Sequence, residues 1–325
     1  MKKIVLFVAV LACLSAAAAP AGEKVIALRA SCNAAANSTL GQFLTFFVNE
    51  VNGRAGGRVQ ATANYGAELG TQPEQVEMAR GGSLEMVVAA PGTGPGTWVP
   101  QLMMFEFPYL FKDNAHYRRM LKAVEGEVSR LVQPYGFIAM GGVSQGSRHM
   151  LTVRPVGKLE DLAGLKMRGP NAVYISMFRA LGAAGTTMDW NEIYTALQTK
   201  VIDGMEASPS MINSMRFQDN AKNLAITNHI IACAYMFFNQ KWFDSLPADL
   251  QALIRASVEA AVEHQQRIDD ADQDLSLEAM RKQGVVVREM PDIDKWVAAC
   301  QPMLDEYRAK GAQWSGFIDL LLSVK

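Results

Sequence analysis

Apolar and polar residues repeat along the chain with two periods, and their order predicts an α/β fold. Short apolar runs and two-residue alternation predict strands, whereas apolar residues three and four positions apart predict helices with one buried face. In order, the first third of the chain predicts a strand at 24–31, a helix at 38–57, a strand at 58–65, a helix at 72–82 and a strand at 84–91. Strands that alternate with helices in this way form a mainly parallel sheet with crossover helices.

The rest of the chain continues the alternation and adds one very long helix. The patterns predict a helix at 114–132, separate strands at 136–143 and 149–156, a strand ending at Arg168, and a long apolar strand at 229–239. From Pro247 a helical pattern continues to about Gln283 without a further Gly or Pro. A helix of that length spans about 55 Å. Because this is longer than a single small domain is wide, we expect the helix to bridge two lobes.

Residues 1–21 have the three parts of a secretory signal peptide. A basic MKK start precedes an apolar core, IVLFVAVLACL, and a region of small residues with predicted cleavage near Ala19 or Ala21. A lipoprotein with Cys13 as its lipidated anchor is the alternative. The apolar core is too short to cross a bilayer, and no later stretch of eighteen apolar residues exists. We therefore expect export to the periplasm.

Composition excludes several classes of partner. The chain has 31 basic and 32 acidic residues, and removal of Lys2 and Lys3 with the signal leaves 29 against 32, a net charge near −3. Nucleic acids and anionic membranes require a basic surface, so we expect neither as a partner. Cys32, Cys233 and Cys300 have the spacing of neither a disulfide framework nor a metal site. We expect buried free thiols, with a bridge between Cys32 and Cys233 as the alternative.

One catalytic motif occurs in the chain. GVSQG at Gly142–Gly146 matches the nucleophile elbow of serine hydrolases, with Ser144 as the nucleophile. The preceding strand fits, but β-branched residues and a proline follow where the hydrolase helix should begin. The four histidines lack metal-ligand spacing, and GTGPGTW lacks the last glycine of the dinucleotide motif. We expect no enzyme activity, no cofactor and no metal, with an exported Ser144 hydrolase as the alternative.

Arg168 ends a predicted strand within KMRGPNAVY, and Asn171 follows a Gly-Pro turn. Arginine has a rigid fork of donors that matches a carboxylate. Open α/β sheets bind their ligands at the carboxyl ends of strands, where this arginine stands. A carboxylate clamp and a structural ion pair at a domain edge fit these residues equally well.

The segments GLKMRGPN and LGAAGTTMDWNEIYTALQTKVIDGMEASP resemble the extracytoplasmic solute-binding proteins of TRAP transporters, DctP type. AELG, GGSLEM, FEFPYLF and WFDSLPADLQ extend the resemblance over nearly all of the mature chain. The resemblance implies a two-lobed periplasmic binding fold, in which each lobe is a mainly parallel sheet flanked by helices. Crossing strands and the long helix join lobe one (24–145 and about 233–270) to lobe two (146–232 and about 271–325).

The function implied by the resemblance is capture of a small organic acid and its delivery to a TRAP membrane permease. A sensory component that hands its ligand to a receptor is an alternative. Arg168 falls at the position of the family's carboxylate clamp, and Arg148 at that of a second, assisting arginine. The other implied ligand-binding positions are Asn171, the turn from Asn33 to Ser38, Trp190 and Phe107.

Two positions depart from some members of the family. Relatives that bind sialic acid or dicarboxylates have polar residues where this chain has Ala90, and just before Pro209, where this chain has Ala207-Ser208. Each buried ligand hydroxyl needs a hydrogen-bond partner, so a sugar acid is less favoured. With Trp190, Phe107 and Tyr174 available, we expect a monocarboxylate with an apolar or aromatic body.

Overall fold

The computed structural model describes residues 24–325, so the predicted signal peptide and Cys13 lie outside the described residues. Within them the chain is built on one nine-stranded sheet with the order β2-β1-β3-β8-β4-β7-β5-β6, and β9 pairs with β8. The strands are β1 (Ile26–Cys32), β2 (Val59–Tyr65), β3 (Met86–Ala89), β4 (Phe137–Thr152), β5 (Lys166–Gly169), β6 (Ala184–Thr187), β7 (Gly204–Ala207), β8 (Asn223–Asn239) and β9 (Val286–Glu289).

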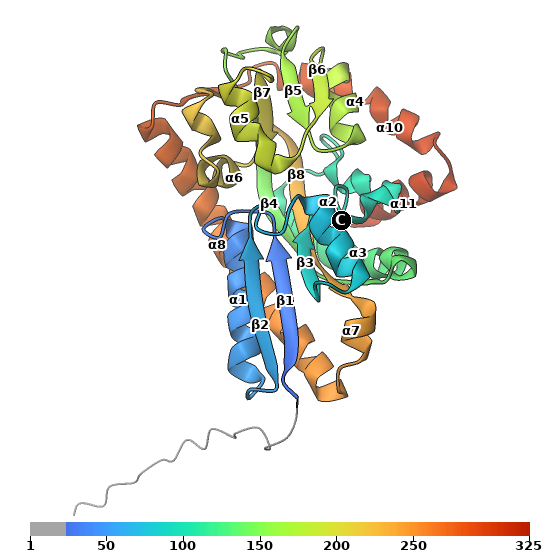
Figure 1. Cartoon of the computed structure of the whole chain (residues 1–325). Helices are drawn as coiled ribbons and strands as arrows, with labels where there is room; N and C mark the ends of the chain where they lie inside the picture. The colour runs from blue at the N-terminus through green and yellow to red at the C-terminus, as the bar shows by residue number, and fades with distance from the viewer. Residues whose placement is uncertain (1–23) are drawn as a thin grey trace, which may run out of the picture.

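The two ends of the sheet form the two predicted lobes (Figure 1). In the first lobe β1 pairs in parallel with β2 and β3, and in the second β5 pairs in parallel with β6 and β7. The helices are α1 (Thr39–Arg54), α2 (Gln72–Gly81), α3 (Asn114–Val132), α4 (Ala172–Ala180), α5 (Ile193–Gln198), α6 (Pro209–Ser214), α7 (Gln240–Asp244), α8 (Ala248–Lys282), α9 (Ile293–Cys300), α10 (Pro302–Arg308) and α11 (Ala312–Ser323). The prediction of a two-lobed α/β fold is confirmed.

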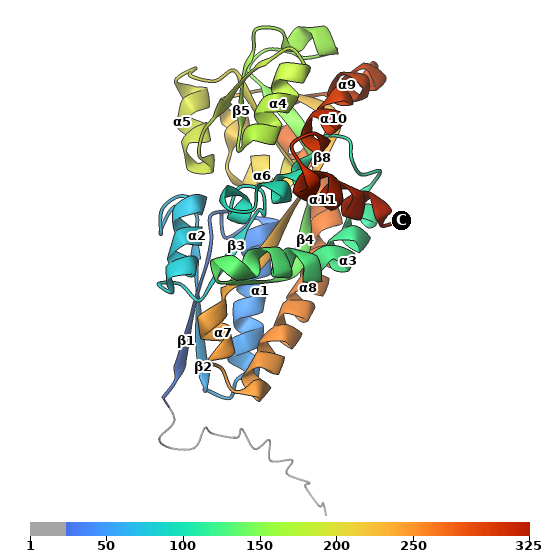
Figure 2. The same ribbon diagram turned by 90° about the vertical axis from the view of Figure 1, so that its right-hand side faces the viewer.

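The long helix α8 bridges the lobes as predicted. It has 35 residues and therefore a length of about 52 Å. It packs against α1 in the first lobe and against α6 in the second (Figure 1). At the C-terminus α11 lies against α3 of the first lobe (Figure 2), and the His116 Nε2 is 2.8 Å from the Val324 carbonyl oxygen. No helix among residues 24–325 is long and apolar enough to cross a membrane.

Two long antiparallel strands, β4 and β8, run through both lobes. The prediction of separate strands at 136–143 and 149–156 is wrong, because β4 continues through the intervening residues for a total of sixteen. Gly141 and Gly146 have φ values of 68° and 75°, which only glycine adopts at little cost. The register between β4 and β8 shifts at both glycines. These bulges bend the strand without ending it, and so carry it from one lobe into the other.

The hydrophobic core is divided by the faces of the sheet and not by the lobes. Val87 of β3 and Met167 of β5, from different lobes, belong to one cluster of buried residues. Val88 and Met205 belong to the cluster on the other face. Because side chains alternate along a strand, neighbouring residues of β3 enter different clusters. Each face is therefore covered by helices of both lobes.

Candidate functional site

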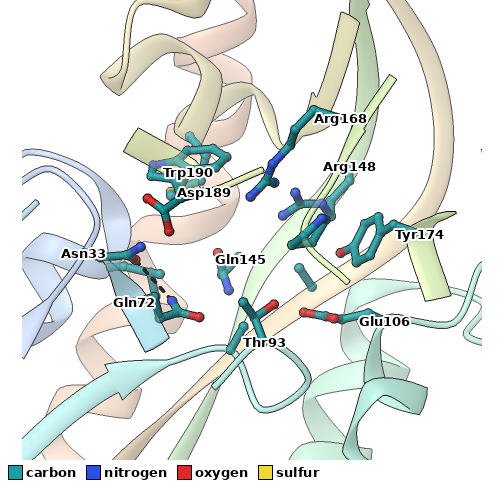
Figure 3. Close-up of a pocket in the computed structure, with 15 residues that line it drawn as sticks. Asn33, Gln72, Thr93, Glu106, Gln145, Arg148, Arg168, Tyr174, Asp189 and Trp190 are labelled. Atoms are coloured by element: carbon teal, nitrogen blue, oxygen red, sulfur yellow. Dashed lines mark hydrogen bonds between the residues drawn. The ribbon is translucent and has the colours of Figure 1, made fainter. Parts of the chain in front are cut away.

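A cleft lies where the lobes meet, beside the crossing strands (Figure 3). It is lined by fifteen residues: Asn33, Leu40, Gln72, Ala90, Thr93 and Glu106 before the crossing strands; Gln145, Arg148 and Ala232 on them; and Arg168, Pro170, Tyr174, Asp189, Trp190 and Met211 of the second lobe. Asn33, Ala90, Arg148, Arg168, Tyr174 and Trp190 are among the residues that the sequence predicted. The other nine were not predicted.

Arg168 is a buried cation that points into the cleft (Figure 3). Its Nε donates to the Met188 carbonyl oxygen at 2.9 Å, and its guanidinium carbon lies 5.8 Å from the centre of the Trp190 ring. Burial lowers the pKa of Arg168 to about 10, against the opposing effect of Glu206. Between residues 24 and 325 no carboxylate forms an ion pair with it. The structural ion pair considered from the sequence is therefore not observed.

Arg148 also lines the cleft, but its donors are directed at Glu206 on the neighbouring strand β7. Its Nη2 donates to Glu206 Oε1 and to the Glu206 carbonyl oxygen, both at 2.8 Å, and its Nε donates to Oε2. Burial has the largest effect and raises the pKa of Glu206, but Arg148 and His229 together outweigh it and the pKa is lowered. These bonds hold the guanidinium in place, while its Nη1 donates to no described residue, so Arg148 stays a predicted ligand contact in the cleft wall.

Glu106 is a cleft carboxyl that the sequence reasoning missed. It ends the short 3₁₀ helix η2 (Pro100–Glu106), and its side chain is only 2% exposed. The Asn171 Nδ2 donates to Glu106 Oε2 at 2.5 Å. Burial raises the pKa of Glu106 to about 7, although Asn171 and Arg148 partly oppose the rise. Oε1 accepts no hydrogen bond from the part of the chain that the structure describes.

Other polar atoms in the cleft wall also lack partners. The Trp190 Nε1 and the Gln72 Oε1 are buried and have no hydrogen-bond partner among the described residues. The amide of Gln72 donates instead to Asn33 Oδ1 at 3.1 Å. Buried polar groups are normally satisfied. Both residues line the cleft, so its wall contains side chains with an unpaired donor and an unpaired acceptor.

Four predicted ligand-binding residues do not line the cleft. Ser38 caps α1, with its Oγ accepting from the Gly41 N–H at 3.1 Å. Asn171 caps α4, and it reaches the cleft only through Glu106. The ring of Phe107 packs edge-on against Tyr307 in the core, with ring centres 5.9 Å apart. Ser208 is fully buried directly before α6.

Ser144 stands inside β4 and not on a turn into a helix. Its Oγ donates to Asn114 Oδ1 and accepts from the Gly146 N–H at 3.0 Å, and no histidine of residues 24–325 contacts it. Its side chain is fully buried. The nucleophile-elbow geometry is therefore absent from the described chain. The three described cysteines are buried and free, as predicted.

The sequence model of the bacterial extracellular solute-binding proteins, family 7 (DctP), matches residues 30–310. The chain belongs to this family. A solute-binding protein of Verminephrobacter eiseniae is 35% identical over 280 residues, which cover 85% of this chain and 83% of that protein. The prediction of a TRAP-type solute-binding protein is confirmed.

Solved structures of the same class share the fold. The TRAP periplasmic solute-binding protein of Xanthobacter autotrophicus, with bound β-D-galacturonate, has a TM-score of 0.85 and 26% identity, covering 92% of this chain and 100% of that one. The corresponding protein of a Polaromonas species, bound to D-erythronate, has a TM-score of 0.87 and 25% identity, covering 92% and 99%. Both ligands are carboxylates.

Proposed function

We propose that this protein captures a small organic acid in the periplasm and delivers it to the membrane permease of a TRAP transporter. The observation that carries the proposal is Arg168, a buried guanidinium in the cleft wall with no carboxylate partner in the described chain. A buried charge is costly unless it is paired. A ligand carboxylate supplies the missing charge and accepts two parallel hydrogen bonds from the arginine fork.

The ligand is a hydroxylated acid. More than half of the fifteen lining side chains carry an amide, carboxyl, guanidinium or hydroxyl group. The unpartnered Trp190 Nε1 and Gln72 Oε1 need a ligand with both acceptors and donors. An apolar body would leave these groups unsatisfied, so this proposal replaces the apolar or aromatic acid favoured by the sequence. Galacturonate and erythronate, bound to the two similar proteins, each carry one carboxylate and several hydroxyls.

Closure of the two lobes on the ligand is the working motion. Cleft residues come from both lobes, so only a closed form brings all of them to one ligand, and the ligand stabilises that form. We place the lobe boundary within β4 and β8, near residues 145 and 233. The contact of α11 with α3 makes this helix part of the first lobe in our proposal. Residues 1–21 act as the export signal.

The test is calorimetry with D-erythronate and D-galacturonate on wild-type protein, Arg168→Ala and Arg168→Lys. Hydrogen bonds to charged groups contribute about 1.5–3 kcal/mol each, so loss of the fork should weaken binding roughly 100-fold or more in Arg168→Ala. Arg168→Lys should also bind weakly, because a point charge cannot reproduce two parallel bonds.

Arg179→Ala is the matched control. Arg179 lies in α4 of the same lobe, its side chain is 75% exposed, and it does not line the cleft. The control should bind like wild type, and all variants should keep the wild-type melting temperature to within a few degrees. Near-normal affinity of Arg168→Ala for an acid that binds the wild type would refute the clamp.

A further inference from the structure

Carboxylate capture accounts for Arg168 but not for the carboxyl group of Glu106. A carboxyl group in the wall of a site that binds a carboxylate does not help to bind that carboxylate. Glu106 should therefore contact another part of the ligand. Glu106 is buried, one of its oxygens is held by Asn171, and the other lacks a partner among residues 24–325. Figure 3 shows its carboxyl group directed into the cleft, from the wall opposite Arg168.

The surrounding chain fixes the position of this carboxyl group. A Cβ atom at Gly92 would lie 2.6 Å from Glu106 Oε2 and 3.0 Å from the Cα of Met103, so only glycine lets the loop at 90–94 cover the acid this closely. On the other side, Asn171 is itself fixed, because its Oδ1 caps α4 by accepting from the Val173 N–H at 3.0 Å. The orientation of Glu106 is therefore set before a ligand arrives.

Arg148, Glu206 and Asp189 have partners within the protein, whereas one oxygen of Glu106 remains available to a ligand. The buried Arg148 and Glu206 pair with each other, so their charges largely cancel. The Asp189 carboxylate accepts from the Asn191 N–H at 3.0 Å and so caps a short helical turn. Asp189 keeps its charge and acts on Arg168, while the guanidinium of Arg168 and the carboxyl of Glu106 stand at opposite walls of the same cleft.

This arrangement distinguishes ligands by their second end. A ligand whose carboxylate binds Arg168 can donate a hydroxyl hydrogen bond to Glu106 Oε1. A ligand with a second carboxylate there would place two like charges together in a buried site, which is unfavourable unless a proton is shared. The site would distinguish these two ligands by charge and not by size, since a terminal hydroxymethyl group and a carboxylate are of similar size.

We propose that Glu106 is a specificity-determining residue: its free oxygen binds a hydroxyl at the end of the ligand remote from Arg168, and its charge excludes acids with a second carboxylate at that end. The proposal rests on the proposed function, because it takes the ligand carboxylate to lie at Arg168. It assigns the ligand to hydroxylated monocarboxylates. Protonation of Glu106 would relax the exclusion, and the raised pKa of about 7 supports such a change within the ordinary pH range.

The experiment compares acids that differ only at the far end. D-Erythronate and meso-tartrate are one such pair, and D-galactonate and galactarate are a second. Affinities are measured by calorimetry at pH 8 and pH 5.5 for the wild type, for Glu106→Gln and for the control Glu127→Gln. Glu127 lies on α3 away from the cleft, where it pairs with Arg130.

At pH 8 the wild type and Glu127→Gln should bind the monocarboxylate of a pair at least about 100-fold more tightly than the dicarboxylate, the ratio expected from about 2.7 kcal/mol of repulsion. Glu106→Gln keeps the acceptor for Asn171 but removes the charge, so its ratio should fall below about tenfold. The wild-type ratio should also fall at pH 5.5, an independent readout that needs no variant.

An unchanged ratio in a folded Glu106→Gln protein would overturn the proposal, as would equal affinity of the wild type for both members of a pair at pH 8. Failure of the wild type to bind any of the four acids or D-galacturonate would count against the proposed hydroxylated-acid function itself. The two failures are therefore distinguishable.

Discussion

Replacing Glu206 by glutamine should destabilise the protein strongly, because it leaves the Arg148 guanidinium buried without a counter-charge. Glu206 is fully buried and Arg148 is 7% exposed. Two hydrogen bonds of the guanidinium end on the Glu206 carboxylate, and a third, at 2.8 Å, ends on its carbonyl oxygen. The Nε2 of His229 is also near the same carboxylate, 3.5 Å from Glu206 Oε2. No other carboxylate of the described residues pairs with Arg148.

The magnitude follows from this burial. Removal of one partner from a buried ion pair costs about 3–5 kcal/mol. A glutamine amide can still accept one hydrogen bond, so we expect the lower part of this range, about 3 kcal/mol. For a protein of this size, each kcal/mol lowers the melting temperature by roughly 1.6 °C, so the expected fall is about 5 °C.

Urea unfolding followed by circular dichroism measures this change in the free energy of unfolding. The double variant Arg148→Met with Glu206→Gln removes both charges and should recover part of the loss, whereas two independent residues would give additive losses. Glu160→Gln, which breaks the exposed pair with Lys295, is the control and should show no measurable change. A Glu206→Gln protein within about 1 kcal/mol of the wild type would refute the reasoning.

The pH dependence gives the same pair a second signature. The pKa of Glu206 is lowered in the folded protein by Arg148, against the effect of burial. The stabilisation by this carboxylate is therefore complete above the ordinary glutamate pKa of about 4.3 and is lost as the pH falls below it. Glu206→Gln should lose this part of the acid sensitivity.

Two further outcomes test the packing. Gly141→Ala should lower the free energy of unfolding in urea by about 2–4 kcal/mol, because φ is 68° and the new Cβ would lie 2.6 Å from a methyl group of Val258. Gly57→Ala, with a φ of 82° and open surroundings, is the control and should lower it by only about 1 kcal/mol. Equal losses would contradict the bulge argument. Burial raises the thiol pKa of Cys32 and Cys300 to about 12, so a disulfide reagent at pH 8 should label neither thiol until urea unfolds the protein, and rapid native labelling would contradict their burial.

Elements with a strong helical period could be predicted from the sequence alone. The helix predicted at 38–57 is observed at 39–54 with Ser38 as its cap, and the bridge helix differs from its predicted bounds by one residue at each end. The continuity of β4 could not be predicted, because the glycines at 141 and 146 have the same sequence signal whether they end a strand or form a bulge within it.

The cleft was predictable in part. Arg168 stood out because it ends a predicted strand directly before a Gly-Pro turn, where open α/β sheets bind their ligands. The ion pair of Arg148 could not be predicted, since its partner Glu206 lies 58 residues later and only the pairing of β4 with β7 brings the two together. Glu106 did carry a signal that went unused: it is a lone acid within the apolar run at 102–111. Acids are rarely buried without a purpose.

The position of β8 in the sheet has a consequence for how this chain acquires its structure. β8 lies between β3 and β4, so the strands of the first lobe have no neighbour linking them to the rest until residue 239 is available. A partly synthesised chain therefore holds only fragments of the sheet with open edges and unfinished cores. Because the central strand comes late in the sequence, the complete sheet can form only after most of the chain is available.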